Sequence, residues 1–237
     1  MIFFDLDGTL LDFKGAEFQA VQAFHNHYSS LFNFTINQDD FYQEWCNIGK
    51  KHYSRFLQGE LSFEQQQIER VKELVGELQD SEAAEHFQFY LKSFENNWRP
   101  FEDVIPCLQN LKGNRLGVIT NGDLNQQRRK LERMGISDHF EVLIASGNVG
   151  FSKPNTKIFE IASEITGTPL HEITYIGDDF VTDIVPCEKL NMRGIWLNRR
   201  FECPEKLVER MITSLNEIYE YKILFLQNCY KFYHKNV

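Results

Sequence analysis

Short apolar runs that end in turn or acidic residues recur along the chain. They cover residues 2–4, 116–119, 142–145, 173–176 and 194–197. Such runs are typical of strands buried in a parallel sheet. Stretches with helical periodicity lie between them, at residues 124–134, 155–166 and 181–190. The alternation predicts an α/β fold with a doubly wound parallel sheet, in which ligands bind at the carboxyl ends of the strands.

Residues 15–97 interrupt this alternation, because they carry helix-length periodicity and no convincing strand. One helical pattern covers residues 63–78 and follows Ser62, a residue type that favours helix N-caps. Pro100 and Pro106 punctuate the return to the α/β pattern. We therefore expect a core domain of residues 1–14 and 98–237, with residues 15–97 inserted as a helical domain.

Composition and charge narrow the class of partner. The chain has 237 residues, of which 42% are hydrophobic and 25% charged, as in an ordinary globular protein. Lys and Arg number 25 against 34 Asp and Glu, so the net charge is −9. That charge repels long polyanions, which argues against a nucleic-acid polymer as partner. A small phosphate ester stays compatible with it, because a bound divalent cation dominates the local potential.

The cysteines and the apolar runs bear on location. The five cysteines are scattered and include no C-x-x-C pair, which favours a reducing cytoplasm over a disulfide framework or a zinc site. The first residues show no pattern of a signal peptide. Apolar runs such as 223–226 fall far short of the roughly 18 residues that span a bilayer. We expect a cytoplasmic protein that does not enter a membrane.

The first predicted strand is followed by two acidic residues, Asp5 and Asp7. Alternation along an extended chain places both carboxylates on the same side of the backbone. Neighbouring carboxylates at a buried strand end are costly unless a cation or a proton lies between them. The pair indicates a metal site, an acid/base pair or both, and solvated acids at a strand end are the alternative.

Two further strand ends carry groups suited to phosphate. The run 116–119 is followed by Thr120, Asn121 and a glycine before a helix, so a hydroxyl, backbone N–H groups and the helix end can face an anion. Lys153, held by Pro154, offers a compact positive charge. Taken alone, the first feature is better explained as a helix cap and the second as a solvated lysine.

The run 173–176 leads into Asp178 and, five residues later, Asp183. Mg²⁺ prefers one or two carboxylates together with water and substrate phosphate. We expect Asp178 to be a direct metal ligand. Asp183, in the first helical turn, would hold a metal-bound water or orient Lys153.

In this order the motifs resemble the haloacid dehalogenase-like superfamily, whose phosphatases show D-x-D-G-T, then Ser or Thr, then Lys, then G-D-x-x-x-x-D. The resemblance spans the whole predicted core. It implies a Mg²⁺-dependent phosphatase that forms an aspartyl-phosphate intermediate, with residues 15–97 as a helical cap.

The resemblance also implies a role for each motif residue. Asp5 would be the nucleophile and a metal ligand. Asp7 would be the acid/base and would offer its backbone carbonyl to Mg²⁺. The phosphate would be held by Thr120, Asn121 and Lys153. The metal site would be completed by Asp178 and supported by Asp183.

Residues 2–13 and 117–162 are most similar to the nucleotidase branch with a helical cap, whose members dephosphorylate pyrimidine and related nucleoside monophosphates. A sugar-phosphate phosphatase and a phosphomutase are the alternatives. Asp7 argues against a haloacid dehalogenase, since the dehalogenases that this chain resembles lack the second acid and the metal. A non-catalytic regulator that binds a phosphorylated ligand is disfavoured by the intact set Asp5, Asp7, Lys153 and Asp178.

Three features outside the motifs have simple interpretations. One segment mixes aromatic and basic residues, namely Trp45, Lys50, Lys51, His52, Tyr53 and Arg55. It could bind a base and a phosphate, but the favoured interpretation is aromatics in the core of the inserted domain and charges in solvent.

We expect the histidines, including His25, His27 and His139, at the surface. The aromatic tail, residues 215–237, predicts a terminal helix or a dimer contact, so the protein is a monomer or a homodimer.

Overall fold

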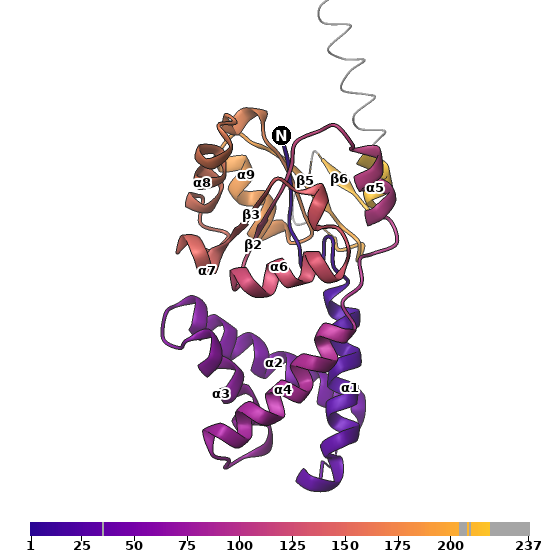
Figure 1. Cartoon of the computed structure of the whole chain (residues 1–237), viewed down its shortest axis with the longest axis vertical. Helices are drawn as coiled ribbons and strands as arrows, with labels where there is room; N and C mark the ends of the chain where they lie inside the picture. Colours follow the sequence, from indigo (N-terminus) through magenta and orange to yellow (C-terminus); the bar gives the residue numbers. More distant parts are fainter. Residues whose placement is uncertain (35, 204–207, 209, 219–237) are drawn as a thin grey trace, which may run out of the picture. The chain divides into compact units, whose positions relative to one another are not determined.

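The computed structural model describes residues 1–34, 36–203, 208 and 210–218. The chain forms two compact units (Figure 1). The α/β unit contains Met1–Asp12 and the described residues from Pro100 onward, and the helical unit is Phe13–Arg99. The chain thus crosses between the units after Asp12 and after Arg99. The sequence pattern predicts these crossings after residues 14 and 97.

The α/β unit contains a six-stranded sheet in the order β3-β2-β1-β4-β5-β6, and every neighbouring pair is parallel. Its strands are β1 (Ile2–Phe4), β2 (Leu116–Thr120), β3 (Val142–Ala145), β4 (Thr174–Gly177), β5 (Arg193–Leu197) and β6 (Met211–Ile212). In β1, Phe3 pairs with Gly117 on one side and with Tyr175 on the other. The strand order reverses direction at β1, which is where doubly wound sheets bind ligands. The predicted fold class is confirmed.

Helices connect the strands of this unit. They are α5 (Val104–Asn110), α6 (Leu124–Arg133), α7 (Ser146–Val149), α8 (Lys157–Thr166) and α9 (Val185–Lys189), with single-turn elements at Ser137–His139, Leu170–Glu172 and Leu215–Glu217. The pattern over 181–190 predicts one α-helix. The structure instead has a π-helical turn at Phe180–Ile184 followed by α9.

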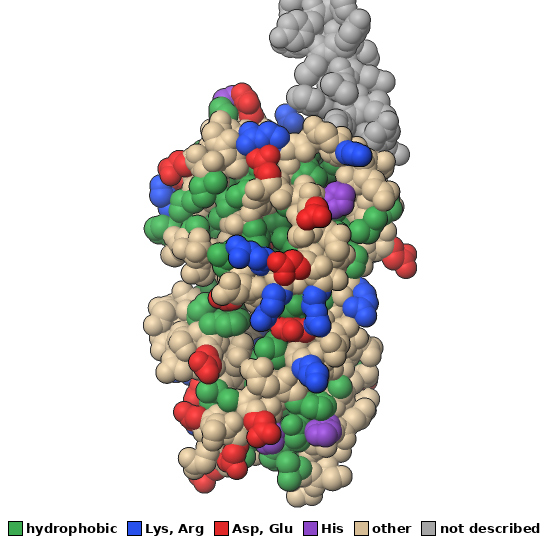
Figure 2. Space-filling view, viewed as in Figure 1, with side chains coloured by type: hydrophobic (Ala, Val, Ile, Leu, Met, Phe, Trp, Pro, Cys, Tyr) green, Lys and Arg blue, Asp and Glu red, His purple; other side chains and the backbone are tan. Residues whose placement is uncertain are grey.

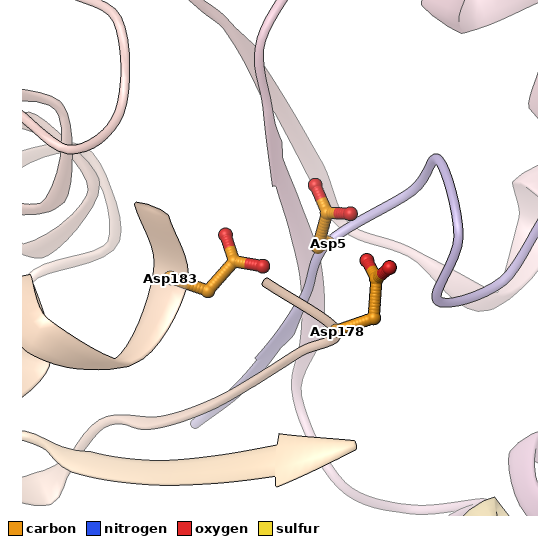
Figure 3. Close-up of side chains that lie close together, drawn as sticks. All are labelled: Asp5, Asp178 and Asp183. Atoms are coloured by element: carbon orange, nitrogen blue, oxygen red, sulfur yellow. The ribbon is translucent and has the colours of Figure 1, made fainter. Parts of the chain in front are cut away.

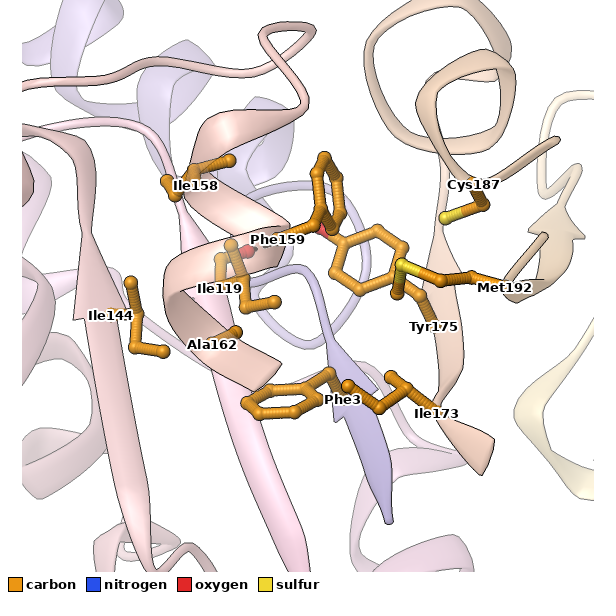
Figure 4. Close-up of a cluster of buried hydrophobic side chains, with 10 residues drawn as sticks. All are labelled: Phe3, Ile119, Ile144, Ile158, Phe159, Ala162, Ile173, Tyr175, Cys187 and Met192. Carbon is orange, nitrogen blue, oxygen red and sulfur yellow. Dashed lines mark hydrogen bonds between the residues drawn. The ribbon is translucent and has the colours of Figure 1, made fainter. Parts of the chain in front are cut away.

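One part of the hydrophobic core of the α/β unit lies between α8 and the sheet (Figure 4). Ile158, Phe159 and Ala162 recur at helical spacing on α8 and are fully buried. They pack in one cluster with Ile119 of β2 and Tyr175 of β4. Burial of each large apolar side chain stabilises the fold by about 1.5–3 kcal/mol. This packing fixes the strands whose ends carry the predicted site residues.

The helical unit consists of α1 (Phe13–Phe32), α2 (Gln38–Leu57), α3 (Phe63–Val75) and α4 (Asp80–Asn96). Ser62 caps α3 as its residue type predicts. Its hydroxyl accepts from the N–H of Gln65 at 3.0 Å, and the Gln65 side chain accepts from the N–H of Ser62 at 2.8 Å. The core is aromatic, with Phe24 and Trp45 fully buried at a ring separation of 5.4 Å.

Two surface properties are relevant to partners. The face shown in Figure 2 carries both acidic and basic side chains. Among the described residues, none of the helices has the length and apolar character that crossing a bilayer requires. Of the aromatic tail, residues 219–237 lie outside the described part of the chain, so the predicted terminal helix or dimer contact stays a prediction.

Candidate active site

The end of β1 delivers Asp5 to the carboxyl edge of the sheet. The backbone N–H of Asp5 donates to the carbonyl of Ile176 at 2.8 Å, which holds Asp5 beside the end of β4. The side chain is 8% exposed, and its Oδ1 accepts from Lys153 Nζ at 2.6 Å. Two strands and a lysine therefore fix this carboxylate.

Asp5, Asp178 and Asp183 form an acidic cluster at this edge. Each contributes a carboxylate oxygen, and these oxygens all lie within 4.8 Å of one another. Figure 3 shows the three carboxylates pointing toward a common space, from the end of β1, the segment after β4 and the π-helical turn. The π-helical turn closes through the Val185 N–H, which donates to the carbonyl of Phe180. This turn brings Asp183 back toward the sheet.

Burial perturbs the acids of this cluster. It raises the pKa of Asp5 well above its usual range. The Lys153 ammonium opposes that rise, and the Asp183 and Asp178 carboxylates add to it. Burial, with a further contribution from Asp183, raises the pKa of Asp178 to about 6. Both shifts disfavour the ionised forms of Asp5 and Asp178 when no cation lies beside them.

Lys153 is the buried cation of the site. Its Nζ donates to Asp5 at 2.6 Å, to Asp183 at 2.7 Å and to the hydroxyl of Tyr175 at 2.8 Å. Burial alone would lower the pKa of Lys153, but the Asp183 and Asp5 carboxylates outweigh it and raise that pKa. The ammonium form is thus retained at neutral pH. The Asn121 side chain pairs with both the N–H and the carbonyl of Lys153, at 2.8 and 3.0 Å, and fixes its backbone.

Two glycines allow the acids to come close. Gly8 has φ +94°, and a Cβ there would overlap the Asp178 carboxylate. At Gly177 a Cβ would overlap the carboxylate of Asp183. A side chain at either position would displace an acid of the cluster.

The turn after β2 differs from the simple anion cradle that its sequence suggests. Thr120 is 1% exposed, and its hydroxyl accepts from the side-chain amide of Gln127 at 2.8 Å. The Gly122 N–H donates to the Ser146 hydroxyl at 2.9 Å. Asp123 caps α6 by accepting from the N–H of Gln126. The structure thus places Thr120 and Asn121 at the site edge, with their side chains engaged in protein contacts.

Asp7 lies apart from the acidic cluster. The cluster of Asp5, Asp178 and Asp183 does not include its carboxylate, although the motif order suggests that Asp5, Asp7 and Asp178 gather together. The two oxygens of Asp7 accept from Lys130 Nζ at 2.8 and 2.7 Å. β1 ends at Phe4, so the strand alternation that would align Asp7 with Asp5 does not extend to it.

The donor set fits a hard divalent cation. Carboxylate oxygens are the ligands that Mg²⁺ prefers, and the cluster offers them from three residues. Near it, Lys153 and Arg200, whose guanidinium is 3.6 Å from Asp178, provide two positive charges against three carboxylates. A divalent cation would change the balance of these charges from −1 to +1, which suits the binding of an anionic phosphate.

Several residues of the site are not evident from the motifs. They are Gln127, Lys130, Tyr175 and Arg200. Gln127 and Lys130 are three residues apart on α6, a spacing that puts two side chains on one helix face. This spacing is the signal that the sequence offers, because it indicates that the two side chains face the same neighbour. If that helix face is buried, the lysine needs an acidic partner.

In the basic and aromatic segment of the helical unit, Trp45 and Lys51 agree with the favoured interpretation of aromatics in the core and charges in solvent. Trp45 is fully buried in the core, whereas Lys51 is exposed and pairs with Glu73 at 2.7 Å. The prediction of surface histidines is wrong for His52, which is 2% exposed. Its Nε2 lies 2.8 Å from Glu73, so a hydrogen-bond partner on α3 compensates for its burial.

Comparison with known proteins identifies relatives over most of the chain. A family model described as haloacid dehalogenase-like hydrolase matches residues 1–190. Pyrimidine 5'-nucleotidase YjjG from Escherichia coli (strain K12) is 30% identical and covers 92% of this chain and 95% of its own. Glyceraldehyde 3-phosphate phosphatase from Methanothermobacter thermautotrophicus is 39% identical and covers 42% of this chain and 45% of its own.

A solved structure shares the fold. The HAD-hydrolase YfnB from Bacillus subtilis, described as putative and bound to magnesium, aligns with a TM-score of 0.75 at 24% identity, covering 93% of this chain and 96% of its own. The family match and the relative along nearly the whole chain agree with the order of the motifs. The chain belongs to the haloacid dehalogenase-like hydrolases.

Proposed function

We propose that this chain is a Mg²⁺-dependent phosphomonoester hydrolase that forms an aspartyl-phosphate on Asp5. The observation that carries the proposal is the buried contact of Asp5 with Lys153, beside Asp178 and Asp183. A nucleophilic carboxylate next to a fixed cation is the arrangement that phosphoryl transfer requires, because charge must be neutralised on the equatorial oxygens. The helical unit would serve as a cap that excludes water.

Each residue at the reacting phosphorus has its own role in the two steps. Lys153 holds Oδ1 of Asp5, so we assign attack on phosphorus to Oδ2. The P–O bond to the leaving group breaks as the Asp7 carboxyl gives that oxygen a proton. In the second step Asp7 takes a proton from water, the water oxygen bonds to phosphorus, and the P–O bond to Asp5 breaks. Inorganic phosphate and the original Asp5 carboxylate result.

The metal assignment separates the acid that orients Lys153 from the two acids that would hold Mg²⁺. Asp183 accepts from Lys153 through Oδ1 and from the N–H of Asp179 through Oδ2 at 3.1 Å, so we assign it to orient Lys153. Asp5 and Asp178 would hold Mg²⁺, together with the backbone carbonyl of Asp7. When bound, Mg²⁺ supplies Lewis-acid stabilisation of phosphoryl charge.

We propose a nucleoside monophosphate, pyrimidine first, as the substrate class. This rests on similarity to a pyrimidine 5'-nucleotidase along nearly the whole chain. The burial of Trp45 removes it as a stacking surface for a base, so the helical unit adds no support. A sugar-phosphate phosphatase is the second candidate, favoured by the match to a glyceraldehyde 3-phosphate phosphatase over 42% of the chain.

The test measures phosphate release from 4-nitrophenyl phosphate with Mg²⁺ and with excess chelator. We expect activity only with Mg²⁺, and none from Asp5→Asn. Asp138→Asn, a change at an exposed aspartate, is the matched control and should keep full activity. Full activity with chelator, or substantial turnover by Asp5→Asn, contradicts the proposed mechanism.

A panel of phosphorylated metabolites then addresses the substrate. We expect pyrimidine nucleoside monophosphates to exceed hexose phosphates and glyceraldehyde 3-phosphate in kcat/KM. If the sugar phosphates lead, the second candidate replaces the first. Appearance of an isomeric phosphate ester in place of inorganic phosphate would identify a mutase.

A further inference from the structure

Two buried side chains of α6 converge on Asp7. Lys130 Nζ donates to Oδ1 at 2.8 Å and to Oδ2 at 2.7 Å. The amide nitrogen of Gln127 donates to Oδ2 at 3.1 Å. The side chain of Lys130 is 2% exposed and that of Asp7 is 27% exposed. Asp7 is therefore reachable from solvent while its main partner is not.

The burial of Lys130 needs an explanation. An ammonium that is removed from water destabilises the fold strongly unless a fixed anion compensates for it. An exposed position on α6 would have avoided that cost, and Arg128 on the same helix is exposed. The contact of one ammonium with both oxygens of Asp7 fixes the plane of the carboxylate as well as its position.

Gln127 links Asp7 to the turn after β2. Its amide nitrogen also lies 2.8 Å from the Thr120 hydroxyl and 2.8 Å from the carbonyl of Asn121. The side chain of Asn121 in turn holds the backbone of Lys153. A chain of contacts thus connects Asp7 to the lysine that contacts Asp5.

We propose that Lys130 and Gln127 are positioning residues that orient the Asp7 carboxylate for proton transfer, an inference that rests on the proposed function. A carboxylate oxygen accepts about two hydrogen bonds. Oδ2 of Asp7 receives two, from Lys130 and Gln127, whereas Oδ1 receives one from Lys130. Oδ1 is therefore the oxygen that gives the proton to the leaving group and takes it from water.

A different role for Lys130 makes a different prediction. A lysine that bound the phosphate of the substrate would change KM and the inhibition by inorganic phosphate. A lysine that only stabilised the fold would change neither kinetic constant in variants that remain folded. A positioning lysine lowers the rate of the step that needs a proton and leaves KM nearly unchanged.

The experiment compares Lys130→Met, Lys130→Arg and Gln127→Leu with the wild type. Arg128→Met removes an exposed cation from the same helix and is the matched control. Rapid-quench kinetics give the rate of phosphoenzyme formation from 4-nitrophenyl phosphate and from an alkyl phosphate. The alkoxide needs a proton as it leaves, whereas nitrophenolate leaves readily without one.

We expect Lys130→Met to slow phosphoenzyme formation from the alkyl phosphate by about 10- to 100-fold, part of the 10²- to 10⁴-fold that general acid catalysis contributes. The rate from nitrophenyl phosphate should fall by less than about 3-fold, and KM should stay within about 2-fold of wild type. Lys130→Arg should restore part of the rate, and Gln127→Leu should give a smaller loss of the same kind.

The outcomes separate this inference from the proposed function. Equal losses on both substrates, or a raised KM with unchanged rate, overturn the positioning role while the wild type remains an Asp5-dependent phosphatase. A wild type that releases no phosphate overturns both. If Lys130→Met does not fold, Gln127→Leu and Lys130→Arg decide by the same comparison of the two substrates. Wild-type rates of phosphoenzyme formation from both substrates in both variants overturn the inference.

Discussion

Gly8 combines two constraints that act at a single residue. Its φ of +94° lies in the region that L side chains rarely adopt, and a Cβ would overlap the Asp178 carboxylate. Its N–H donates to the carbonyl of Leu11 at 3.0 Å, which closes the turn directly after Asp7. The G of the D-x-D-G-T motif is therefore explained by backbone geometry and by the room that an acid of the cluster needs.

We predict that Gly8→Ala costs more stability than Gly135→Ala. Gly135 also has a positive φ, +69°, but a Cβ there meets nothing within 4 Å. Gly135→Ala should therefore cost only the backbone term of about 1–2 kcal/mol. Gly8→Ala should add an overpacking term of about 1–3 kcal/mol and weaken Mg²⁺ binding, because Asp178 must move. Urea unfolding measures the loss of stability, and Mg²⁺ titration of activity measures the weaker binding of the metal. Equal free energies of unfolding and equal Mg²⁺ affinities in the two variants would contradict the contact with Asp178.

At the scale of elements, the strands of the α/β unit follow from sequence more closely than the helices do. Continuous apolar runs predict five strands because both faces of a parallel sheet are buried. β6 has only two residues and its Met211 is exposed, so it leaves no apolar run. The π-helical turn is also absent from the pattern, since its Asp183 contacts depend on tertiary partners and not on a period of apolar residues.

The candidate site, too, is predicted from the sequence only in part. The motif order places Asp5, Lys153, Asp178 and Asp183 at strand ends, and the structure brings them together. The partners of Asp7 come from α6, which is distant in sequence and carries no motif. A single sequence does not reveal which buried lysine pairs with which acid, because that pairing is decided by how α6 packs on the sheet.

Within the helical unit, α1 and α3 share a partly buried ion pair. Glu17 lies 4.0 Å from the guanidinium of Arg70, which in turn stacks over Trp45 at 4.7 Å from the ring centroid. The Cys46 thiol lies 3.5 Å from Glu17. Burial raises the pKa of Glu17, and Arg70 opposes that rise without cancelling it.

We predict that Glu17→Gln becomes more favourable relative to wild type as the pH rises. The folded state binds the proton of Glu17 more tightly than the unfolded state does, so wild-type stability falls as the pH increases from about 4.5 through the raised pKa. Glutamine mimics the protonated form and does not titrate. Chemical unfolding of both proteins between pH 5 and 8 gives the difference. A difference that is constant over this range, or that shrinks with pH, would falsify the sign of the shift.

At the scale of the whole molecule, the α/β unit is assembled from two separate stretches of chain. The first stretch contributes only β1 and its loop, yet β1 lies between β2 and β4 and carries Asp5. The central strand therefore depends on a pairing across a long insertion, and the acidic cluster exists only when that pairing has formed. A ligand that bridges Asp5 and Asp178 should stabilise the entire α/β unit, because it joins the two stretches.

We predict that Mg²⁺ raises the unfolding temperature through this bridge. Mg²⁺ that binds only the folded state stabilises that state by about 2.7 kcal/mol when free Mg²⁺ is 100 times its Kd. For a chain of this size, this free energy raises the unfolding temperature by roughly 5–10 °C.

Asp178→Asn should abolish most of the shift in unfolding temperature, and Asp138→Asn, at an exposed position, should retain it. NaCl at equal ionic strength controls for screening of the net charge of −9, since screening acts on any charged surface. If calorimetry resolves two transitions, only that of the α/β unit should move, because Asp5 and Asp178 both belong to it. An equal shift in Asp178→Asn, or one reproduced by NaCl, would place the effect outside the acidic cluster and remove the structural basis for the metal assignment.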